Sequence, residues 1–216
     1  MDDQRALCAG ILLAGGANRR LQGRDKAFLS IPSAPATAGP ATVAERALVA
    51  LRAVAADIVV AGGNRERFLP LTGAVPFRIV ADLHSGMGPL AGIHAALLST
   101  TCDVALVVAC DMPFISIPVL RLLRGLAFAA GDGVDAVVPV LDGRPEPLHA
   151  AYRRSCGEHL GAFLAGGGRK ASAALDGLRW LPVTERDLAA VPEARGSFAN
   201  WNYPEQWQLA GPEHAK

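Results

Sequence analysis

Short runs of apolar residues alternate along the chain with longer segments that have the length of helices. Because the apolar runs are continuous and do not alternate with polar residues, they are typical of strands covered on both faces. We expect strands over residues 6–13, 57–61, 77–81, 104–109, 136–140 and 148–152. Helices are expected over 41–54, 89–98, 117–128 and 157–165, where Pro89 and Pro118 suit first-turn positions that need no N–H donor.

The alternation of strands and helices predicts an α/β fold. Successive strand–helix–strand units build a three-layer α/β/α sandwich around a mostly parallel sheet, with right-handed crossovers. A chain of 216 residues suits a single domain of this kind. Residues 31–40 contain three prolines and no periodicity, so we expect a surface loop there.

Composition places the chain in the globular class and argues against several partners. Hydrophobic residues make up 51% and charged residues 19% of the sequence, unlike a disordered protein. The net charge of +1 disfavours a surface devoted to nucleic acid or to an anionic membrane. No apolar run reaches the roughly 18 residues of a membrane span, and the acidic start differs from a signal peptide. We therefore expect a cytoplasmic location. The four cysteines, Cys8, Cys102, Cys110 and Cys156, form no C-x-x-C pair, so we expect them to be reduced.

The first strand runs into a glycine-rich loop, Leu13-Ala14-Gly15-Gly16, and the cations Arg19, Arg20 and Lys26 follow it. Glycines let successive N–H groups face an anion, and the cations add charge around the same point. The loop therefore predicts a site for nucleotide phosphates at the carboxyl edge of the sheet. The G-x-G-x-x-G and Walker patterns are both absent, which disfavours hydride transfer and P-loop hydrolysis. A plain strand-to-helix turn is the alternative, although it does not call for the three cations.

A second strand, 104–109, is followed by Cys110-Asp111-Met112-Pro113. A carboxylate at the carboxyl end of a central strand is well placed to bind Mg²⁺, which prefers hard oxygen ligands. The alternative is an N-cap for the next helix, but Asp111 lies well upstream of its expected start. We interpret Asp111 as a metal ligand.

Weaker signals follow other strands and leave two interpretations open. Asp82 precedes the glycine-rich segment 86–92 and would accept hydrogen bonds from a ribose or base, or cap its own loop. Asn64 would contact a base edge or occupy a turn, and Asn202, close to Asn200, would cap a helix. The histidines suggest no catalytic triad, so we expect His84, His94 and His149 to be structural or peripheral.

Four ordered motifs together resemble the MobA-like nucleotidyltransferases, which attach nucleotides to the molybdenum cofactor, and among them the molybdenum cofactor guanylyltransferases. The resemblance spans nearly the whole chain. Its residues are Leu13–Gly16 with Arg20, Asp25 and Lys26, then Asp82 with Gly88–Gly92, Cys110–Pro113, and Asn200-Trp201-Asn202-Tyr203-Pro204-Glu205. The chain departs from the family pattern at Leu21-Gln22, where the family has methionine and glycine, and in the longer stretch 32–40.

The resemblance implies a Rossmann-like sheet of the nucleotidyltransferase type and the transfer of GMP from GTP to the terminal phosphate of molybdopterin, with release of pyrophosphate. Mg²⁺ would be the cofactor, and GTP and molybdopterin or Mo-molybdopterin the substrates. Transient contacts with molybdenum-insertion proteins and molybdoenzyme chaperones are also implied. CMP transfer to the same cofactor, sugar-phosphate nucleotidyl transfer and a non-catalytic nucleotide-binding module are the alternatives.

The resemblance also assigns residues. Residues 1–115 would form the nucleotide-binding part and 116–210 the acceptor-binding part of one domain. Gly16 favours guanine, because the cytidylyltransferase relatives usually have L-A-A-G in place of L-A-G-G. The implied roles are catalysis for Arg20, Lys26 and Asp111, metal binding for Asp111, and nucleotide binding for Leu13, Ala14, Gly15, Gly16, Lys26, Asn64, Asp82 and Asp111. For the acceptor, cations at Arg169 and Lys170 (otherwise an exposed polar turn) and the asparagines Asn200 and Asn202 are candidates.

Overall fold

The computed structural model describes residues 7–15, 25–31, 42–62, 65–68, 71, 75–84 and 86–201. Among these residues, eight strands form one sheet with the order β3-β2-β1-β4-β7-β5-β6, and β8 pairs with β5. The strands are β1 (Cys8–Leu13), β2 (Asp57–Ala61), β3 (Arg78–Val80), β4 (Val104–Ala109), β5 (Ala136–Leu141), β6 (Arg144–Pro145), β7 (His149–Arg153) and β8 (Trp180–Val183).

Helices lie on both faces of this sheet. The α-helices are α2 (Val43–Arg52), α3 (Arg65–Phe68), α4 (Pro89–Ser99), α5 (Ile117–Ala129), α6 (Cys156–Ala165) and α7 (Glu185–Leu188). Short 3₁₀ helices are η2 (Lys26–Phe28), η4 (Gly131–Gly133), η5 (Ala173–Gly177) and η6 (Ala194–Phe198). The six expected strands and four expected helices are therefore all present, most of them shifted by one or two residues at an end.

The sheet is mixed. Strands β3, β2, β1 and β4 pair in parallel, and β5 pairs in parallel with β8. Strand β7 runs antiparallel to both β4 and β5. The direction reverses because the chain passes from β5 to β7 through the short hairpin with β6, and a parallel return needs a much longer crossover. The sequence pattern did not reveal this reversal.

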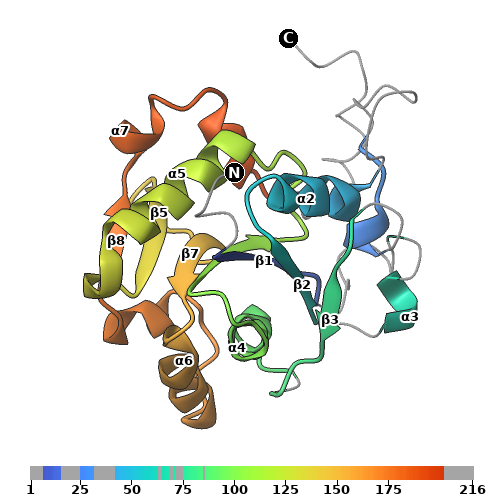
Figure 1. Cartoon of the computed structure of the whole chain (residues 1–216), viewed down its shortest axis with the longest axis horizontal. Helices are drawn as coiled ribbons and strands as arrows, with labels where there is room; N and C mark the ends of the chain where they lie inside the picture. Colours follow the sequence, from blue (N-terminus) through green and yellow to red (C-terminus); the bar gives the residue numbers. More distant parts are fainter. Residues whose placement is uncertain are drawn as a thin grey trace.

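The core has two halves, one on each side of the sheet. Helices α2 and α5 cover one face, and α4 and α6 cover the other (Figure 1). Along β1, Leu12 packs in the first half and Ile11 in the second, and both are fully buried. A strand with apolar side chains on both faces needs helices on both faces, so the three-layer sandwich expected from the sequence is confirmed.

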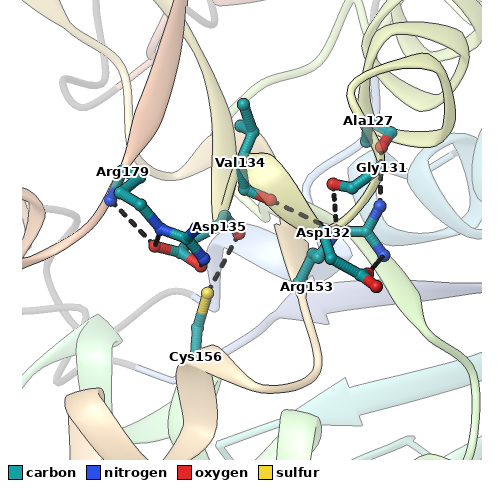
Figure 2. Close-up of polar contacts among 8 residues, drawn as sticks. All are labelled: Ala127, Gly131, Asp132, Val134, Asp135, Arg153, Cys156 and Arg179. Atoms are coloured by element: carbon teal, nitrogen blue, oxygen red, sulfur yellow. Dashed lines mark hydrogen bonds and ion pairs between the residues drawn. The ribbon is translucent and has the colours of Figure 1, made fainter.

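The amino ends of β5 and β8 are tied together by a cluster of polar contacts (Figure 2). Arg179 donates to the Asp135 carboxylate from Nε (3.0 Å) and Nη2 (2.7 Å), and this pairing lowers the pKa of Asp135. Arg153, at the end of β7, donates to the carbonyl oxygens of Gly131 (3.0 Å) and Ala127 (3.1 Å). These contacts connect β5, β7 and β8 to the end of α5. They lie at the end of the sheet opposite the carboxyl end of β4.

The four cysteines all lie in the described part of the chain and form no disulfide. Cys8, Cys110 and Cys156 are buried, and burial raises the pKa of the Cys156 thiol to about 12. The Cys156 thiol is therefore protonated at neutral pH, and all three side chains are parts of the core. Within the described residues, no helix has the length and apolar character needed to cross a bilayer.

Candidate active site

The carboxyl ends of the parallel strands form one continuous edge. Backbone hydrogen bonds extend the ladder past the strands: Ala14 N donates to Ala61 O (2.8 Å), and Cys110 N donates to Leu13 O (3.0 Å). On the far side, Gly62 N donates to the carbonyl oxygen of β3 residue Val80 (3.2 Å). The loops that follow β1, β2, β3 and β4 therefore start side by side, and they carry the residues Gly15, Gly62, Asp82 and Asp111.

Gly15 and Gly62 meet with no room for a side chain between them. A Cβ atom built on Gly62 would lie 2.7 Å from the Cα of Gly15, and Gly62 has φ +82°, where glycine is favoured. Gly62 is buried in this contact, whereas Gly15 is exposed at the point where the sequence predicts phosphate binding. Gly62 was not singled out from the sequence, where it is one glycine of a Gly-Gly-Asn turn.

The Asp82 carboxylate lies against this pair of glycines. Its Oδ1 atom is 3.6 Å from the position of a Cβ on Gly62 and 3.4 Å from that of a Cβ on Gly92 of α4. Oδ1 is buried and accepts no hydrogen bond from the described residues, and burial raises the pKa of Asp82. An unpaired buried acceptor costs about 1–3 kcal/mol, so this atom suits a donor supplied by a ligand. The described residues give no support to the alternative in which Oδ1 caps the Asp82 loop.

Helix α4 begins beside Asp82 with an open N-terminus. Its N-cap is Gly88, at φ +81°, which has no side chain to satisfy the first N–H groups, and Pro89 follows it. The helix dipole therefore favours negative charge at this edge. The backbone of Arg169 passes close by, since a Cβ on Gly88 would lie 3.9 Å from the Arg169 carbonyl oxygen. Exposed Arg169 and Lys170 thus stand at the same edge as Asp82.

Asp111 follows β4 at the centre of the edge and is partly buried. Its carbonyl oxygen accepts a hydrogen bond from Trp201 N (2.8 Å), which places Asn200 next to it. Trp201 also packs edge-on against Phe114, with ring centroids 5.1 Å apart. The N-cap of α5 is Ser116, so Asp111 does not cap that helix.

Glu146 lies close to Asp111 and was missed by the sequence analysis. Burial raises its pKa, and the negative charge of Asp111 raises it further. Nothing in the sequence around Glu146 indicates this proximity, because it depends on the antiparallel pairing of β7 with β4. Glu146 also lines a hollow of about 370 Å³, together with Leu141, Asp142, Arg144, Arg195, Phe198 and Ala199.

The donor set at the end of β4 fits a hard divalent cation. Asp111 and Glu146 offer carboxylate oxygens, which are the ligands that Mg²⁺ prefers. Among the described residues, no group of three or more histidine, cysteine, aspartate and glutamate side chains gathers at one place. A metal here would therefore complete its coordination with water and ligand phosphates, as Mg²⁺ commonly does.

Several expected site residues lie outside the described residues: Gly16, Arg20, Asn64 and Asn202, together with the side chain of Lys26. The two departures from the family pattern, at Leu21-Gln22 and in the stretch 32–40, also lie outside them. The backbone of Lys26 begins η2. Asp25 caps this turn, since its Oδ1 accepts from Ala27 N (3.1 Å).

The histidines occupy structural positions, as expected. His149 is fully buried against Phe198 at 4.6 Å between ring centroids, and burial lowers its pKa to about 4. His94 is buried in α4, its ring 5.4 Å from that of His84, and burial also lowers its pKa. His94 and His149 are therefore neutral at physiological pH, and neither forms a nucleophile–base pair with a described residue.

A mixed α/β sheet whose parallel strands end in a glycine-lined edge that also carries carboxylates is typical of the class of nucleotide-binding α/β proteins. Residues 10–179 match the family described as "MobA-like NTP transferase domain". The chain belongs to this family of nucleotidyltransferases.

Relatives support the assignment over most of the chain. One, named "Probable molybdenum cofactor guanylyltransferase", from Pelotomaculum thermopropionicum, is 34% identical over 90% of this chain and 87% of its own length. A second, "Molybdenum cofactor guanylyltransferase" from Desulfosudis oleivorans, is 32% identical over 93% of both chains. The family resemblance found in the four motifs is thereby confirmed.

Solved structures show the same fold. The molybdopterin-guanine dinucleotide biosynthesis protein A from Archaeoglobus fulgidus has a TM-score of 0.77 and 29% identity, covering 94% of this chain and 96% of its own. The 2-C-methyl-D-erythritol 4-phosphate cytidylyltransferase from Thermus thermophilus has a TM-score of 0.59 and 19% identity, covering 93% and 95%. This second likeness concerns the fold alone.

Proposed function

We propose that this protein transfers GMP from GTP to the terminal phosphate of molybdopterin or Mo-molybdopterin and releases pyrophosphate. The observation that carries the proposal is the gathering of Gly15, Asp82 and Asp111 at one sheet edge. Relatives named for this activity, at 32–34% identity over at least 90% of the chain, support the choice of substrates.

The nucleotide would lie across the ends of β1, β2 and β3. Backbone groups of Leu13, Ala14 and Gly15 would hold its phosphates, with Gly16 and Lys26 completing the loop. The unpaired Oδ1 of Asp82 would accept a hydrogen bond from an N–H of the base or an O–H of the ribose, and Asn64 would add a contact to the base.

The chemistry we propose is an in-line displacement. An oxygen of the acceptor's terminal phosphate attacks the α-phosphorus of GTP, forming a new P–O bond. The bond from the α-phosphorus to the bridging oxygen breaks, and pyrophosphate leaves with the electron pair. Because the attacking phosphate is already an anion, no strong general base is needed. Arg20 and Lys26 would stabilise the charge that develops. Mg²⁺ bound at Asp111 would supply further neutralisation of phosphate charge.

The acceptor would bind on the other side of Asp111. Asn200 is held beside Asp111 by the Trp201 hydrogen bond, and Asn202 follows it. Arg169 and Lys170 stand at the same edge and would meet the acceptor's phosphate or pterin. With these substrates, the protein would work in the cytoplasm and exchange its labile cofactor with molybdenum-insertion proteins and molybdoenzyme chaperones.

Substrate choice tests the proposal directly. The protein is incubated with Mg²⁺, molybdopterin and each α-labelled nucleoside triphosphate, and labelled dinucleotide and pyrophosphate are measured. We expect product from GTP, and none without Mg²⁺ or with Asp111→Asn. Incorporation from CTP but not GTP would overturn the assignment, and GTP binding without pyrophosphate release would identify a non-catalytic module.

A further inference from the structure

The pairing of two strands brings Glu146 and Asp111 to the same end of the sheet. The last pair of the antiparallel register between β4 and β7 joins Val108 to His149. Asp111 follows Val108 by three residues, and Glu146 precedes His149 by three residues, so both leave the sheet at the same end. The electrostatic influence of Asp111 on Glu146 agrees with this placement.

The backbone of Glu146 is held in position. Its N–H donates to the carbonyl oxygen of Pro139 on β5 (2.8 Å), and its own carbonyl oxygen accepts from His149 N (3.1 Å). The carboxylate is therefore carried by a hydrogen-bonded turn between two strands of the sheet. A ligand on such a turn is positioned more reproducibly than one on a free loop.

The Glu146 carboxylate has no cationic partner among the described residues. Arg195 lines the same hollow but is bound to Asp142 (3.0 Å) and Glu185 (3.3 Å). The half-buried Glu146 carboxylate thus stands at the same end of the sheet as Asp111, with no cationic side chain of the described residues paired to it. A divalent cation between the two residues would be bound by oxygens of both carboxylates.

We propose that Glu146 is a second carboxylate ligand, beside Asp111, of the divalent metal that serves nucleotidyl transfer in this protein. This inference rests on the metal role proposed for Asp111. The metal would then be held between the end of β4, on the nucleotide side, and the start of β7, on the acceptor side. Two carboxylates suit a hard cation that also keeps phosphate and water ligands.

Metal affinity tests the inference without relying on catalysis. Mn²⁺ binding is measured by electron paramagnetic resonance of the free ion, with the full-length protein and saturating α,β-methylene GTP, which cannot undergo transfer. Glu146→Gln is expected to weaken Mn²⁺ binding by roughly tenfold or more, and Glu146→Asp to weaken it less. The matched control is Asp142→Asn, which removes a carboxylate from the same hollow that is already paired with Arg195 and should change affinity less than about twofold.

Thermal unfolding of the metal-free variants separates a ligand from a structural residue. Glu146→Gln removes like-charge repulsion and should leave the melting temperature unchanged or raised, whereas loss of a structural contact would lower it. Wild-type Mn²⁺ affinity in Glu146→Gln would overturn the inference. Wild-type affinity in Asp111→Asn would instead remove the metal role of Asp111. If the Mn²⁺ affinity depends on Glu146 but the protein transfers CMP, this inference would stand and the proposed transfer of GMP would be wrong.

Discussion

The backbones of Gly15 and Gly62 touch at the carboxyl ends of β1 and β2, where a Cβ on Gly62 would lie 2.7 Å from the Gly15 Cα and 2.8 Å from the Gly15 nitrogen. Contact with backbone atoms cannot be relieved by turning a side chain aside. The two loops that would surround the nucleotide therefore support each other, and each fixes the other's conformation.

Gly62→Ala should accordingly disturb both the fold and nucleotide binding. The added methyl group meets backbone, and alanine disfavours φ +82°, so we expect the free energy of unfolding to fall by about 1–3 kcal/mol. GTP affinity, measured by calorimetry, should fall as well. Gly125→Ala is the matched control, because its Cβ would meet nothing within 4 Å in helix α5; its stability should be unchanged or higher by up to about 1 kcal/mol. Equal effects of the two substitutions would contradict this account.

Asp82→Asn should separate stability from binding. Burial raises the pKa of Asp82 above its ordinary value of 3.8, so the folded state binds this proton more tightly than the unfolded chain does. The resulting stabilisation is fully present below pH 3.8 and is lost as the pH rises through the folded-state pKa. The amide of the variant stays neutral, so it does not lose stability in this way. As the pH rises through this interval, the melting temperature of the variant should therefore increase relative to that of the wild type. The GTP affinity of the variant at neutral pH should be lower. A stability difference that is constant with pH would count against a raised pKa.

Arg179→Gln should give the opposite pH dependence. Hydrogen bonds from Arg179 lower the pKa of Asp135, so their contribution to stability is present above the ordinary Asp pKa and is lost as the pH falls through the lowered value (Figure 2). The melting temperatures of variant and wild type should therefore differ at neutral pH and converge in acid. Titration of the Asp135 carboxyl by NMR should show its pKa rising in the variant. Arg121→Gln, on the surface of α5, should leave both measurements unchanged.

The sequence pattern was most informative where burial is continuous. The runs 57–61 and 104–109 were predicted with their observed bounds, because strands covered on both faces need an almost continuous series of apolar residues. Strands β6 and β8 were missed. Among the described residues, Arg144–Pro145 pairs with β5 alone, across a hairpin, and β8 contains Pro182 and also pairs with β5 alone. Their formation depends on partners distant in sequence rather than on their own composition.

The same distinction applies to the candidate site. Asp82 and Asp111 were found because each directly follows a recognisable strand, and a parallel sheet brings such strand ends together. Glu146 and Gly62 were not found. Glu146 approaches Asp111 only through the reversed direction of β7, and Gly62 matters only because Gly15 occupies the adjacent space. Neither relationship has a local sequence signal.

Trp201 offers a test of whether the late Asn-Trp-Asn motif positions the acceptor side of the site. Its N–H donates to the Asp111 carbonyl oxygen, and its ring packs edge-on against Phe114, so Trp201 ties the motif to the end of β4. Trp201→Ala keeps the backbone N–H but removes the ring contact, a type of contact worth about 0.5–1.5 kcal/mol, and should let Asn200 move away from Asp111. We expect kcat/KM for the acceptor to fall about tenfold, with the affinity for GTP nearly unchanged because Gly15 and Asp82 are untouched.

Trp180→Ala is the control. Trp180 begins β8 beside Asp135, at the opposite end of the sheet, so its loss should lower stability without a selective decrease in kcat/KM for the acceptor. If both substitutions lower kcat/KM to the same extent, the motif acts only through overall stability and has no part in positioning the acceptor.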